Sequence, residues 1–474
     1  MSLIKSISGI RGTIGSGQGE NLTPIEIAKF SAAYGSFAIN KNKNTKIKII
    51  IGRDARLSGE MVRSLVAGTL LSQGIEVIDL GITSTPTVEM AVISQKAHGG
   101  IIITASHNPQ GWNALKLINE LGEFLSADEG REILELAELG NFNYVQEDKI
   151  GHYVFNPYLE WEHIHKIEEL FLVDKEKIKI KNFKIVVDGI NSSGGTMVPN
   201  LLEYLGVKVE NIILLNCEPN GVFAHRPEPL AENLMQIMNK VKEEKADLGI
   251  VVDPDVDRLA FIDENGEMLS EEYTLVAIAD YVLENFETIN SLSPNKYNKA
   301  TVSNLSSSRA LKDVTERHGG TYEAAAVGEV NVVKKMKELK SVIGGEGNGG
   351  IIFPELHYGR DALIGIALFL SMLAKSGKKV SDLRKELPEY FMVKDKIELT
   401  PDINVKKILE NIKEVYKSEK ITDIDGVKID FANSWVHLRV SNTEPIIRVY
   451  TEAKTQDETN RLVELIKEKI LANI

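Results

Sequence analysis

The order of hydrophobic and polar positions predicts repeated units of strand, turn and helix. In residues 46–80, 183–210 and 299–327, a run of β-branched residues is followed by a turn rich in serine or glycine, an apolar helix and a second strand. The first two copies align at their turns, 58–62 over 194–198, and the third copy is fainter. Because strand, polar turn and helix make a βα unit, we expect three related α/β domains in tandem.

Further along the chain the pattern changes and suggests where the domains end. A helical pattern at 156–172 leads into the second repeat, and an apolar helix is expected at 362–375. The tail interleaves strands (394–399, 434–440, 446–453) with helices (404–417, 457–472), which is typical of an α+β domain. We therefore expect four domains, at 1–155, 156–258, 259–380 and 381–474.

Composition and charge narrow the class of protein. The chain has 474 residues, 43% of them hydrophobic, and a net charge of −13. That charge argues against a nucleic-acid or anionic-membrane partner, which would need clustered lysine and arginine. Cys217 is the single cysteine, so no internal disulfide can form, and no apolar run approaches the length of a membrane span. With no segment resembling a signal peptide, we expect a cytoplasmic protein.

The first candidate for chemistry follows an apolar strand. The run ending at residue 103 is followed by Thr-Ala-Ser-His-Asn-Pro (104–109), which places Ser106 and His107 at the carboxyl end of a buried strand. Open α/β sheets bind ligands at that edge. A serine hydrolase is not favoured, because neighbouring side chains in extended backbone point in opposite directions and the G-x-S-x-G turn is absent.

A second strand end carries three acids. Asp253, Asp255 and Asp257 alternate in Asp-Pro-Asp-Val-Asp-Arg (253–258), and their spacing turns the three carboxylates to one side. Such carboxylates repel each other unless a cation joins them, and oxygen ligands favour Mg²⁺.

Two other kinds of site share features with this stretch. An EF-hand is excluded, because Arg258 stands where that loop requires glycine and the flanking residues read as strands. A phosphatase of the haloacid-dehalogenase type would use Asp253 as nucleophile and Asp255 as general acid. It remains the alternative enzyme, although Asp257 replaces that family's threonine or valine.

Two more loops complete the set. In 342–353, glycines let the backbone approach a ligand, while Glu346 and Asn348 suit sugar hydroxyls or an amino group. In 438–453, arginines, hydroxyls and an amide suit a phosphate dianion: Arg439, Ser441, Asn442, Thr443 and Arg448. A serine nucleophile, a divalent cation, a hydroxyl reader and a phosphate anchor together predict phosphoryl transfer to and from a phosphorylated sugar.

With these loops in view, essentially the whole chain resembles the α-D-phosphohexomutase family. The matching segments are the active-site signature (104–109), the metal loop (253–258), Gly-Glu-Gly-Asn-Gly in the sugar loop (345–349) and Arg-Val-Ser-Asn-Thr-Glu-Pro in the phosphate loop (439–445). The resemblance implies an α/β fold of three tandem related domains with mixed sheets, plus a C-terminal α+β domain, around a central cleft. It also implies interconversion of sugar 1-phosphates and 6-phosphates through a bisphosphate intermediate.

The resemblance further assigns roles to individual residues. Ser106 would carry the phosphate, with Mg²⁺ between it and the three aspartates, and a sugar bisphosphate would activate the enzyme. Lys116 would be a general acid or base, with His107 close by, Arg258 beside the metal and Arg11 near the phosphoserine. Glu346, Asn348 and Gly349 would bind the sugar and the last domain its phosphate. The partner is a hexose or hexosamine phosphate, and the chain would be a monomer or homodimer.

The sequence predicts the identity of the sugar less precisely than it predicts the type of reaction. Glu346, Asn348 and Gly349 resemble the sugar loop of acetylglucosamine-phosphate mutases, and Glu329 stands where several phosphoglucosamine mutases have an acid. Gly350 and Glu329 stand where the dual-specificity phosphomannomutase/phosphoglucomutases have histidines, so the resemblance does not imply those histidine contacts here. An acid near the sugar favours a glucosamine ammonium. We therefore expect a phosphoglucosamine mutase, with a phosphomannomutase/phosphoglucomutase of broad specificity as the alternative.

Overall fold

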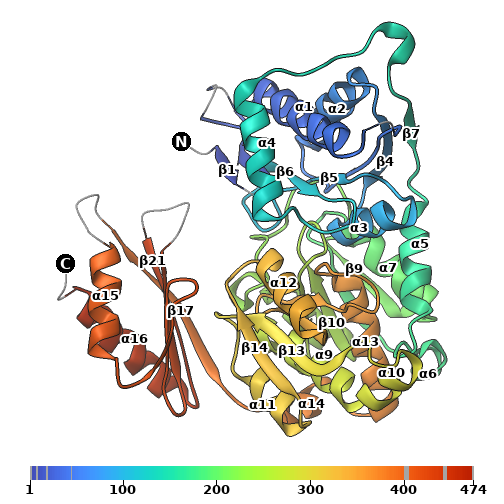
Figure 1. Ribbon diagram of the computed structural model, residues 1–474. Helices are drawn as coiled ribbons and strands as arrows, with labels where there is room; N and C mark the ends of the chain where they lie inside the picture. The colour runs from blue at the N-terminus through green and yellow to red at the C-terminus, as the bar shows by residue number, and fades with distance from the viewer. Residues whose placement is uncertain are drawn as a thin grey trace. The chain divides into compact units, whose positions relative to one another are not determined.

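The chain folds into two compact units. The computed structural model describes residues 3–6, 9–15, 17, 20–43, 45–399, 405–440 and 446–471. Unit 1 comprises Met1–Thr274 and Asn348–Leu383, and unit 2 comprises Leu275–Gly347 and Arg384–Ile474 (Figure 1). Helices α9 (Glu271–Glu284) and α14 (Val380–Glu386) run across the two boundaries.

The first sheet of unit 1 is mixed, with the order β1-β2-β6-β5-β3-β4-β7. Strands β5, β3, β4 and β7 are parallel, and β6, β2 and β1 extend the sheet by antiparallel pairing. The strands are β1 (Ile4–Ser6), β2 (Gly9–Thr13), β3 (Lys48–Arg53), β4 (Glu76–Ile82), β5 (Gly100–Ile103), β6 (Trp112–Ile118) and β7 (Tyr153–Phe155). The helices are α1 (Pro24–Lys41), α2 (Gly59–Ser72), α3 (Thr85–Ser94), α4 (Ala127–Leu139) and the 3₁₀ turn η1 (Glu147–Lys149).

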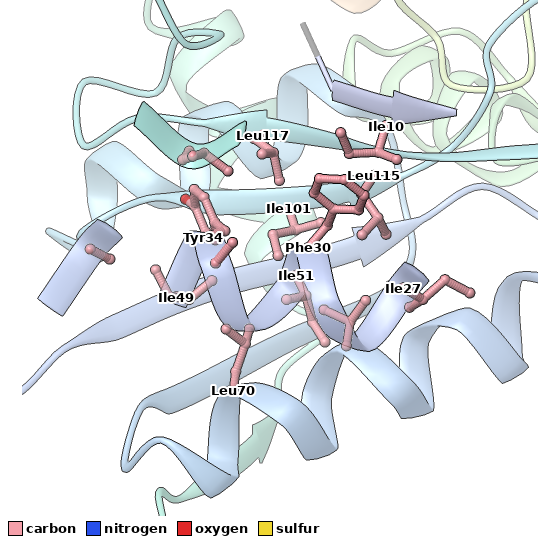
Figure 2. Packing of buried hydrophobic residues seen from close by; sticks show 14 of the residues in the cluster. Ile10, Ile27, Phe30, Tyr34, Ile49, Ile51, Leu70, Ile101, Leu115 and Leu117 are labelled. Carbon is pink, nitrogen blue, oxygen red and sulfur yellow. The ribbon is translucent and has the colours of Figure 1, made fainter. Parts of the chain in front are cut away.

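Alternating side chains of this sheet build two core layers. Ile49 and Ile51 of β3 pack with residues of α1, α2 and α4, whereas Ile50 packs with residues of α3. Figure 2 shows Phe30 and Tyr34 of α1 in the first of these layers. The Tyr34 hydroxyl is satisfied, since it donates to a backbone carbonyl at 2.7 Å. Burial on both faces explains why the strands read as continuous apolar runs.

The second sheet of unit 1 has the order β12-β11-β10-β8-β9. Strands β10, β8 and β9 are parallel, and β11 and β12 are antiparallel. Phe261 of β11 stacks on Phe369 of α13, with ring centroids 3.8 Å apart. The strands are β8 (Ile185–Asp188), β9 (Ile212–Leu215), β10 (Leu248–Val252), β11 (Leu259–Ile262) and β12 (Met268–Leu269), and unit 1 also contains β16 (Gly350–Ile352). The helices are α5 (Leu159–Glu168), α6 (Lys175–Lys181), α7 (Gly194–Tyr204), α8 (Met235–Glu244) and α13 (Ala362–Ser376), with 3₁₀ turns η2 (Val209–Asn211) and η3 (Ala231–Asn233).

Unit 2 contains two groups of strands. In the first, β14, β13 and β15 are parallel neighbours. The second is the antiparallel sheet β17-β21-β20-β19-β18, on which apolar residues of α15 and α16 pack. The strands are β13 (Asn298–Asn304), β14 (Thr321–Ala325), β15 (Ser341–Glu346), β17 (Phe391–Glu398), β18 (Lys420–Thr422), β19 (Val427–Asp430), β20 (Trp435–Val440) and β21 (Ile446–Ala453). The helices are α10 (Phe286–Leu292), α11 (Ala310–Arg317), α12 (Glu329–Leu339), α15 (Val405–Val415) and α16 (Gln456–Leu471).

The repeats expected from the sequence each fold as a strand, a helix and a parallel strand. They correspond to β3-α2-β4, β8-α7-β9 and β13-α11-β14. The expected fold class, α/β domains followed by an α+β domain, is confirmed. The exact domain boundaries and the central cleft stay predictions. Within the described ranges, no helix has the length and apolar character needed to cross a bilayer.

Candidate functional site

The segment after β5 holds Ser106 in an unusual backbone conformation. Ser106 has φ of 46°, in the left-handed region that non-glycine residues rarely adopt. Its N–H donates to Thr104 Oγ1 at 2.9 Å, and Thr104 Oγ1 donates to Asp54 Oδ2 at 2.7 Å. The strained residue is therefore supported by side chains from two neighbouring strand ends, as is common where strain serves function.

A buried arginine braces the same segment. Arg56 is 1% exposed, and its Nε donates to Asp54 Oδ2 at 3.0 Å. Its terminal nitrogens donate, at 2.6 to 2.9 Å, to the carbonyls of Ser106, Asn108, Pro109 and Trp112. One guanidinium thus donates to four carbonyls of the serine loop, and it fixes the path of that loop.

The metal loop is the turn between β10 and β11. Val256 has φ of 59°, and the Asp253 side chain closes the turn, because Oδ1 accepts the N–H groups of Asp257 and Arg258 at 3.1 Å each. This turn, rather than an extended alternation, brings the three carboxylates together. Their ligand oxygens lie within 4.8 Å of one another, and all three residues are 0% exposed.

Ser106 and the three aspartates meet in unit 1. The Ser106 Oγ donates to Asp253 Oδ2 at 2.8 Å, although the two residues are 147 positions apart. The hydroxyl does not donate to His107, which agrees with the exclusion of a serine hydrolase. Both carboxylate oxygens of Asp253 thus accept hydrogen bonds, from Ser106 and from the turn, and this does not favour Asp253 as the nucleophile of a phosphatase.

The carboxylates titrate differently because their partners differ. Burial, and next the charges of Asp255 and Asp257, raise the pKa of Asp253 well above its usual value. Burial also acts to raise the pKa of Asp255, but the charge and hydrogen bond of Lys116, together with the hydrogen bond of Thr85, outweigh burial, and the net shift is downward. Within the described residues, Asp255 Oδ1 and Asp257 Oδ1 are buried and accept no hydrogen bond. Three buried carboxylates this close together, two of them with an oxygen that accepts no hydrogen bond, fit a divalent cation such as Mg²⁺.

Three cationic or imidazole groups predicted from the sequence lie around this centre. Lys116 Nζ donates to Asp255 Oδ2 at 2.7 Å and lies 3.6 Å from Asp257 Oδ2. These charges outweigh burial and raise the pKa of the lysine. The charge of Arg258, followed by burial and Lys116, lowers the pKa of His107 well below its usual value.

Arg11 is placed by strand pairing. It lies on β2 opposite Ala114 of β6, and Lys116 is two residues further along β6. Opposed residues and their second neighbours share one face of a sheet, so Arg11 and Lys116 are on the same face. Burial lowers the pKa of Arg11.

The sugar-loop residues are divided between the two units. In unit 2, Glu346 is 4% exposed, and its Oε1 accepts hydrogen bonds from Asn304 at 2.8 Å and from Gly328 N–H at 3.1 Å. In unit 1, the Gly349 carbonyl accepts from Leu259 N–H at 3.0 Å, directly after the metal loop.

Glycine is needed at the unit 1 end of this loop. Gly349 has φ of +87°, and a Cβ there would lie 2.2 Å from the carbonyl oxygen of Leu259. A Cβ at Gly350 would lie 2.3 Å from Arg360 Cδ, so a side chain fits at this position only if Arg360 moves. Asn348 is half-buried, and its Oδ1 accepts from Gly350 N–H at 3.2 Å.

The phosphate loop belongs to unit 2. Arg439 of β20 and Arg448 of β21 are directly opposite each other, an arrangement of like charges that favours a bound anion. The Arg439 Nε donates to both carboxylate oxygens of Asp425, at 3.0 and 2.9 Å. Ser441, Asn442 and Thr443 lie outside the described residues.

Three residues that support the centre were not singled out from the sequence. Thr85 Oγ1 donates to Asp255 Oδ2 at 2.6 Å, and Arg360 Nη2 donates to Asp257 Oδ2 at 2.7 Å. Arg56 is the third. Thr85 and Arg360 are 170 and 103 positions away from their partners, so no local pattern could mark them. For Arg56, an arginine in the turn after an apolar strand was the only available signal.

Comparisons with known proteins agree with this arrangement. Models of phosphoglucomutase/phosphomannomutase domains match the chain in order, with alpha/beta/alpha domains I, II and III at residues 3–143, 161–266 and 270–391 and the C-terminal domain at 393–469.

Individual relatives and a solved structure extend the match. A phosphoglucomutase/phosphomannomutase of Thermococcus kodakarensis is 37% identical over 94% of each chain. A phosphoglucosamine/phosphogalactosamine mutase of Sulfurisphaera tokodaii is 34% identical, over 98% of this chain and 99% of the relative. A structure from Burkholderia thailandensis, of a phosphoglucomutase/phosphomannomutase family protein, shares the fold with a TM-score of 0.81 and 22% identity, covering 99% of this chain and 97% of that one. The chain therefore belongs to the phosphoglucomutase/phosphomannomutase family of α-D-phosphohexomutases, and it is an isomerase that moves phosphate within a sugar phosphate.

Proposed function

We propose that the chain is a phosphoglucosamine mutase that works through a phosphoserine at Ser106. The observation that carries the proposal is the 2.8 Å contact between Ser106 Oγ and Asp253 Oδ2 within the buried aspartate group. The contact supports the proposal, because the hydroxyl that would carry the phosphate lies against the carboxylates that would hold the cation. A sugar bisphosphate would supply the first phosphate to Ser106.

Asp253, Asp255 and Asp257 would hold Mg²⁺ together with the serine phosphate. When bound, the cation supplies a fixed positive charge that offsets the negative charge of the transferring group. Thr85 and Arg360 keep two of the carboxylates oriented through short hydrogen bonds. The strained Ser106 and the Arg56 brace hold the oxygen in one position, which is the main contribution a protein can make to phosphoryl transfer.

The transfer requires a proton to move. As the bond from phosphorus to Ser106 Oγ breaks, a bond to the sugar hydroxyl oxygen forms, and the hydroxyl proton must leave. His107 is suited to accept it, because its lowered pKa keeps the ring neutral and its buried Nδ1 has no hydrogen-bond partner among the described residues. Lys116 has a raised pKa and stays cationic, which suits it to donate a proton to the serine oxygen or to stabilise its charge.

The preference for glucosamine rests on acidic residues in unit 2. Glu346 is held by two hydrogen bonds, and Glu329, at the start of α12, is 7% exposed. Carboxylates favour an ammonium over a neutral hydroxyl at the same position of a sugar. The second candidate is a phosphomannomutase/phosphoglucomutase of broad specificity, which is favoured by the name of the Thermococcus kodakarensis relative.

A comparison of kcat/KM for the 6-phosphates of glucosamine, glucose and mannose tests this proposal. We expect glucosamine to be preferred by about tenfold or more, the effect of one favourable charge contact. Glu329→Gln should reduce that preference, whereas Glu323→Gln, on the neighbouring strand β14, should leave it unchanged. A preference for glucose or mannose would establish the second candidate instead.

The metal and the reaction type are tested separately. Removal of divalent ions with EDTA should abolish interconversion, and added Mg²⁺ should restore it. Release of inorganic phosphate without formation of the isomer would contradict the mutase mechanism and support the phosphatase alternative.

A further inference from the structure

A second buried group of metal-type ligands lies in unit 1, formed by His163, His357 and Asp361. His163 is on α5, and the other two precede and cap α13. Their side chains are 0 to 1% exposed, and one ligand atom from each lies within 4.8 Å of the others. The phosphohexomutase chemistry described above uses none of them.

Both imidazoles direct the same ring nitrogen at one oxygen. His163 Nε2 lies 2.9 Å and His357 Nε2 lies 3.3 Å from Asp361 Oδ2. The other oxygen of that carboxylate is already engaged, because Oδ1 accepts the N–H groups of Leu363 and Ile364 at the start of α13. Oδ2 is therefore the oxygen at which the two rings converge.

The second nitrogen of each ring also has a polar neighbour. His163 Nδ1 lies 2.9 Å from Thr87 Oγ1, and His357 Nδ1 lies 3.4 Å from Glu89 Oε2, both on α3. In metal sites of proteins, the non-ligating nitrogen of a histidine commonly donates to an oxygen, which fixes the ring and its tautomer. Thr87 is such a partner for His163, whereas the 3.4 Å separation of His357 Nδ1 from Glu89 is not a hydrogen bond. If both Nδ1 atoms carry the proton, both Nε2 atoms present lone pairs toward Asp361.

The lone pairs cannot face a buried carboxylate without a cation between them. Direct hydrogen bonding can satisfy His163, with Thr87 as donor and Asp361 as acceptor. His357 lies between two carboxylates, and its buried Nδ1 has no hydrogen-bond partner among the described residues, so direct hydrogen bonding does not satisfy this ring. A divalent ion at Asp361 Oδ2 and the two Nε2 atoms gives both rings and the Asp361 carboxylate a partner and balances the charges of Asp361 and Glu89.

The separations also suit a small ion. Ligands at about 2.0–2.1 Å from a tetrahedral ion are about 3.3 Å from each other, close to the 2.9 and 3.3 Å found here. Two imidazoles and one carboxylate are donors typical of Zn²⁺, whereas the all-oxygen aspartate group suits Mg²⁺. The two clusters of this chain therefore differ in the metal that they select.

We propose that His163, His357 and Asp361 form a second, structural metal site that takes Zn²⁺ or a similar transition metal. The site ties together α3, α5 and the segment before α13. The same α3 begins with Thr85, which contacts Asp255, and Arg360, which contacts Asp257, precedes Asp361 directly. The ion would thus hold in place the elements that orient the aspartate group.

Metal analysis of untagged full-length protein tests the proposal. After expression with zinc and dialysis into buffer containing Mg²⁺, we expect about one zinc ion per chain. The variants His163→Gln and His357→Gln should each lose it. His165→Gln removes an exposed histidine from the same helix α5 and should retain the zinc, as should Asp255→Asn in the aspartate group.

The position of the ion is decided independently of the variants. Anomalous scattering at the zinc edge from crystals of the unaltered protein should give a peak between His163 and His357. A chain without zinc, or a zinc peak at the aspartate group alone, would overturn the proposal and identify the cluster as a charged hydrogen-bond network. This outcome can be read even if the histidine variants fail to fold.

Discussion

The aspartate group of unit 1 and the arginine pair of unit 2 both assemble like charges, but they are built differently. Asp253, Asp255 and Asp257 are 0% exposed and are held by donors from distant segments. Arg439 and Arg448 are only half-buried. Strand pairing places them opposite each other, and Arg439 is paired with the carboxylate of Asp425. Buried like charges need fixed counter-charges, whereas at the surface water screens the repulsion. Changes in the two regions should therefore affect different properties of the enzyme.

Ser106→Ala should have the largest effect. Without the oxygen that carries the phosphate, kcat should fall by about 10⁴-fold or more. Coupled assays of isomer formation measure this loss. Ser64→Ala, which removes an exposed hydroxyl from α2, is the matched control and should keep full activity. Substantial turnover by Ser106→Ala would contradict the proposed phosphoserine.

Arg56→Met tests whether the serine loop depends on its buried brace. Loss of the guanidinium removes a donor from the carbonyls of the serine loop and the buried counter-charge from Asp54, so the free energy of unfolding should fall by about 3–5 kcal/mol. Denaturant unfolding measures the change. Arg131→Met removes an arginine that is paired with Asp128 on the exposed face of α4, and it should cost under about 1 kcal/mol. Equal losses of unfolding free energy in Arg56→Met and Arg131→Met would show that Arg56 stabilises the fold no more than an exposed arginine does.

In unit 2, His437 supports the turn that carries Asp425, the partner of Arg439. Its Nε2 donates to the Asp425 carbonyl at 2.7 Å, and Ser306 Oγ lies 2.9 Å from Nδ1. Burial is the main cause that lowers the pKa of His437 to about 4. The unfolded chain, with a histidine pKa near 6.5, takes up the proton first, so stability is lost as the pH falls from about 6.5 toward 4.

The size of this loss can be measured against a variant. Relative to His437→Gln, the unaltered chain should lose about 2 kcal/mol of stability between pH 7 and pH 5. Urea midpoints across this range report the difference. The exposed His165→Gln should instead follow the unaltered chain at each pH, and a constant difference for His437→Gln would contradict the buried neutral ring.

Arg439→Ala should separate binding from chemistry. Removal of one charge-assisted donor to the substrate phosphate should raise KM by about 10- to 50-fold, and the Mg²⁺ dependence should stay unchanged. Lys406→Ala, an exposed lysine on α15, is the control. A shifted Mg²⁺ requirement in Arg439→Ala would argue against a separate phosphate anchor.

Thr85→Val should give the smallest effect. In contrast to Arg439→Ala, it should change the Mg²⁺ requirement and leave the KM for the sugar phosphate unchanged. The isosteric change removes the hydroxyl donor to Asp255, so half-saturation with Mg²⁺ should need about tenfold more metal while KM for the sugar at saturating metal is retained. Thr69→Val on α2 removes a hydroxyl that donates only to a backbone carbonyl and provides the comparison. An unchanged Mg²⁺ requirement would show that Thr85 does not support the metal loop.

Local patterns in the sequence determined the repeated units and the reactive groups. The strand, helix and strand units, the strands and helices of the tail, Ser106 at a strand end and three aspartates within five positions can all be read from neighbouring residues. These features follow from side-chain periodicity and from residue chemistry, which act over short stretches of chain. The small strands β18 and β19 and the positive φ of Val256 carry no such pattern.

The tertiary structure decided which distant groups complete the centre. It brought Ser106 to Asp253, Thr85 to Asp255, Arg56 beneath the serine loop and His163 to Asp361, the last pair 198 positions apart. In their local sequence, Thr85, Arg56 and His163 do not differ from an ordinary surface threonine, arginine or histidine. Their partners are determined by how the sheets and helices pack into a core. A pattern confined to neighbouring residues does not encode that packing.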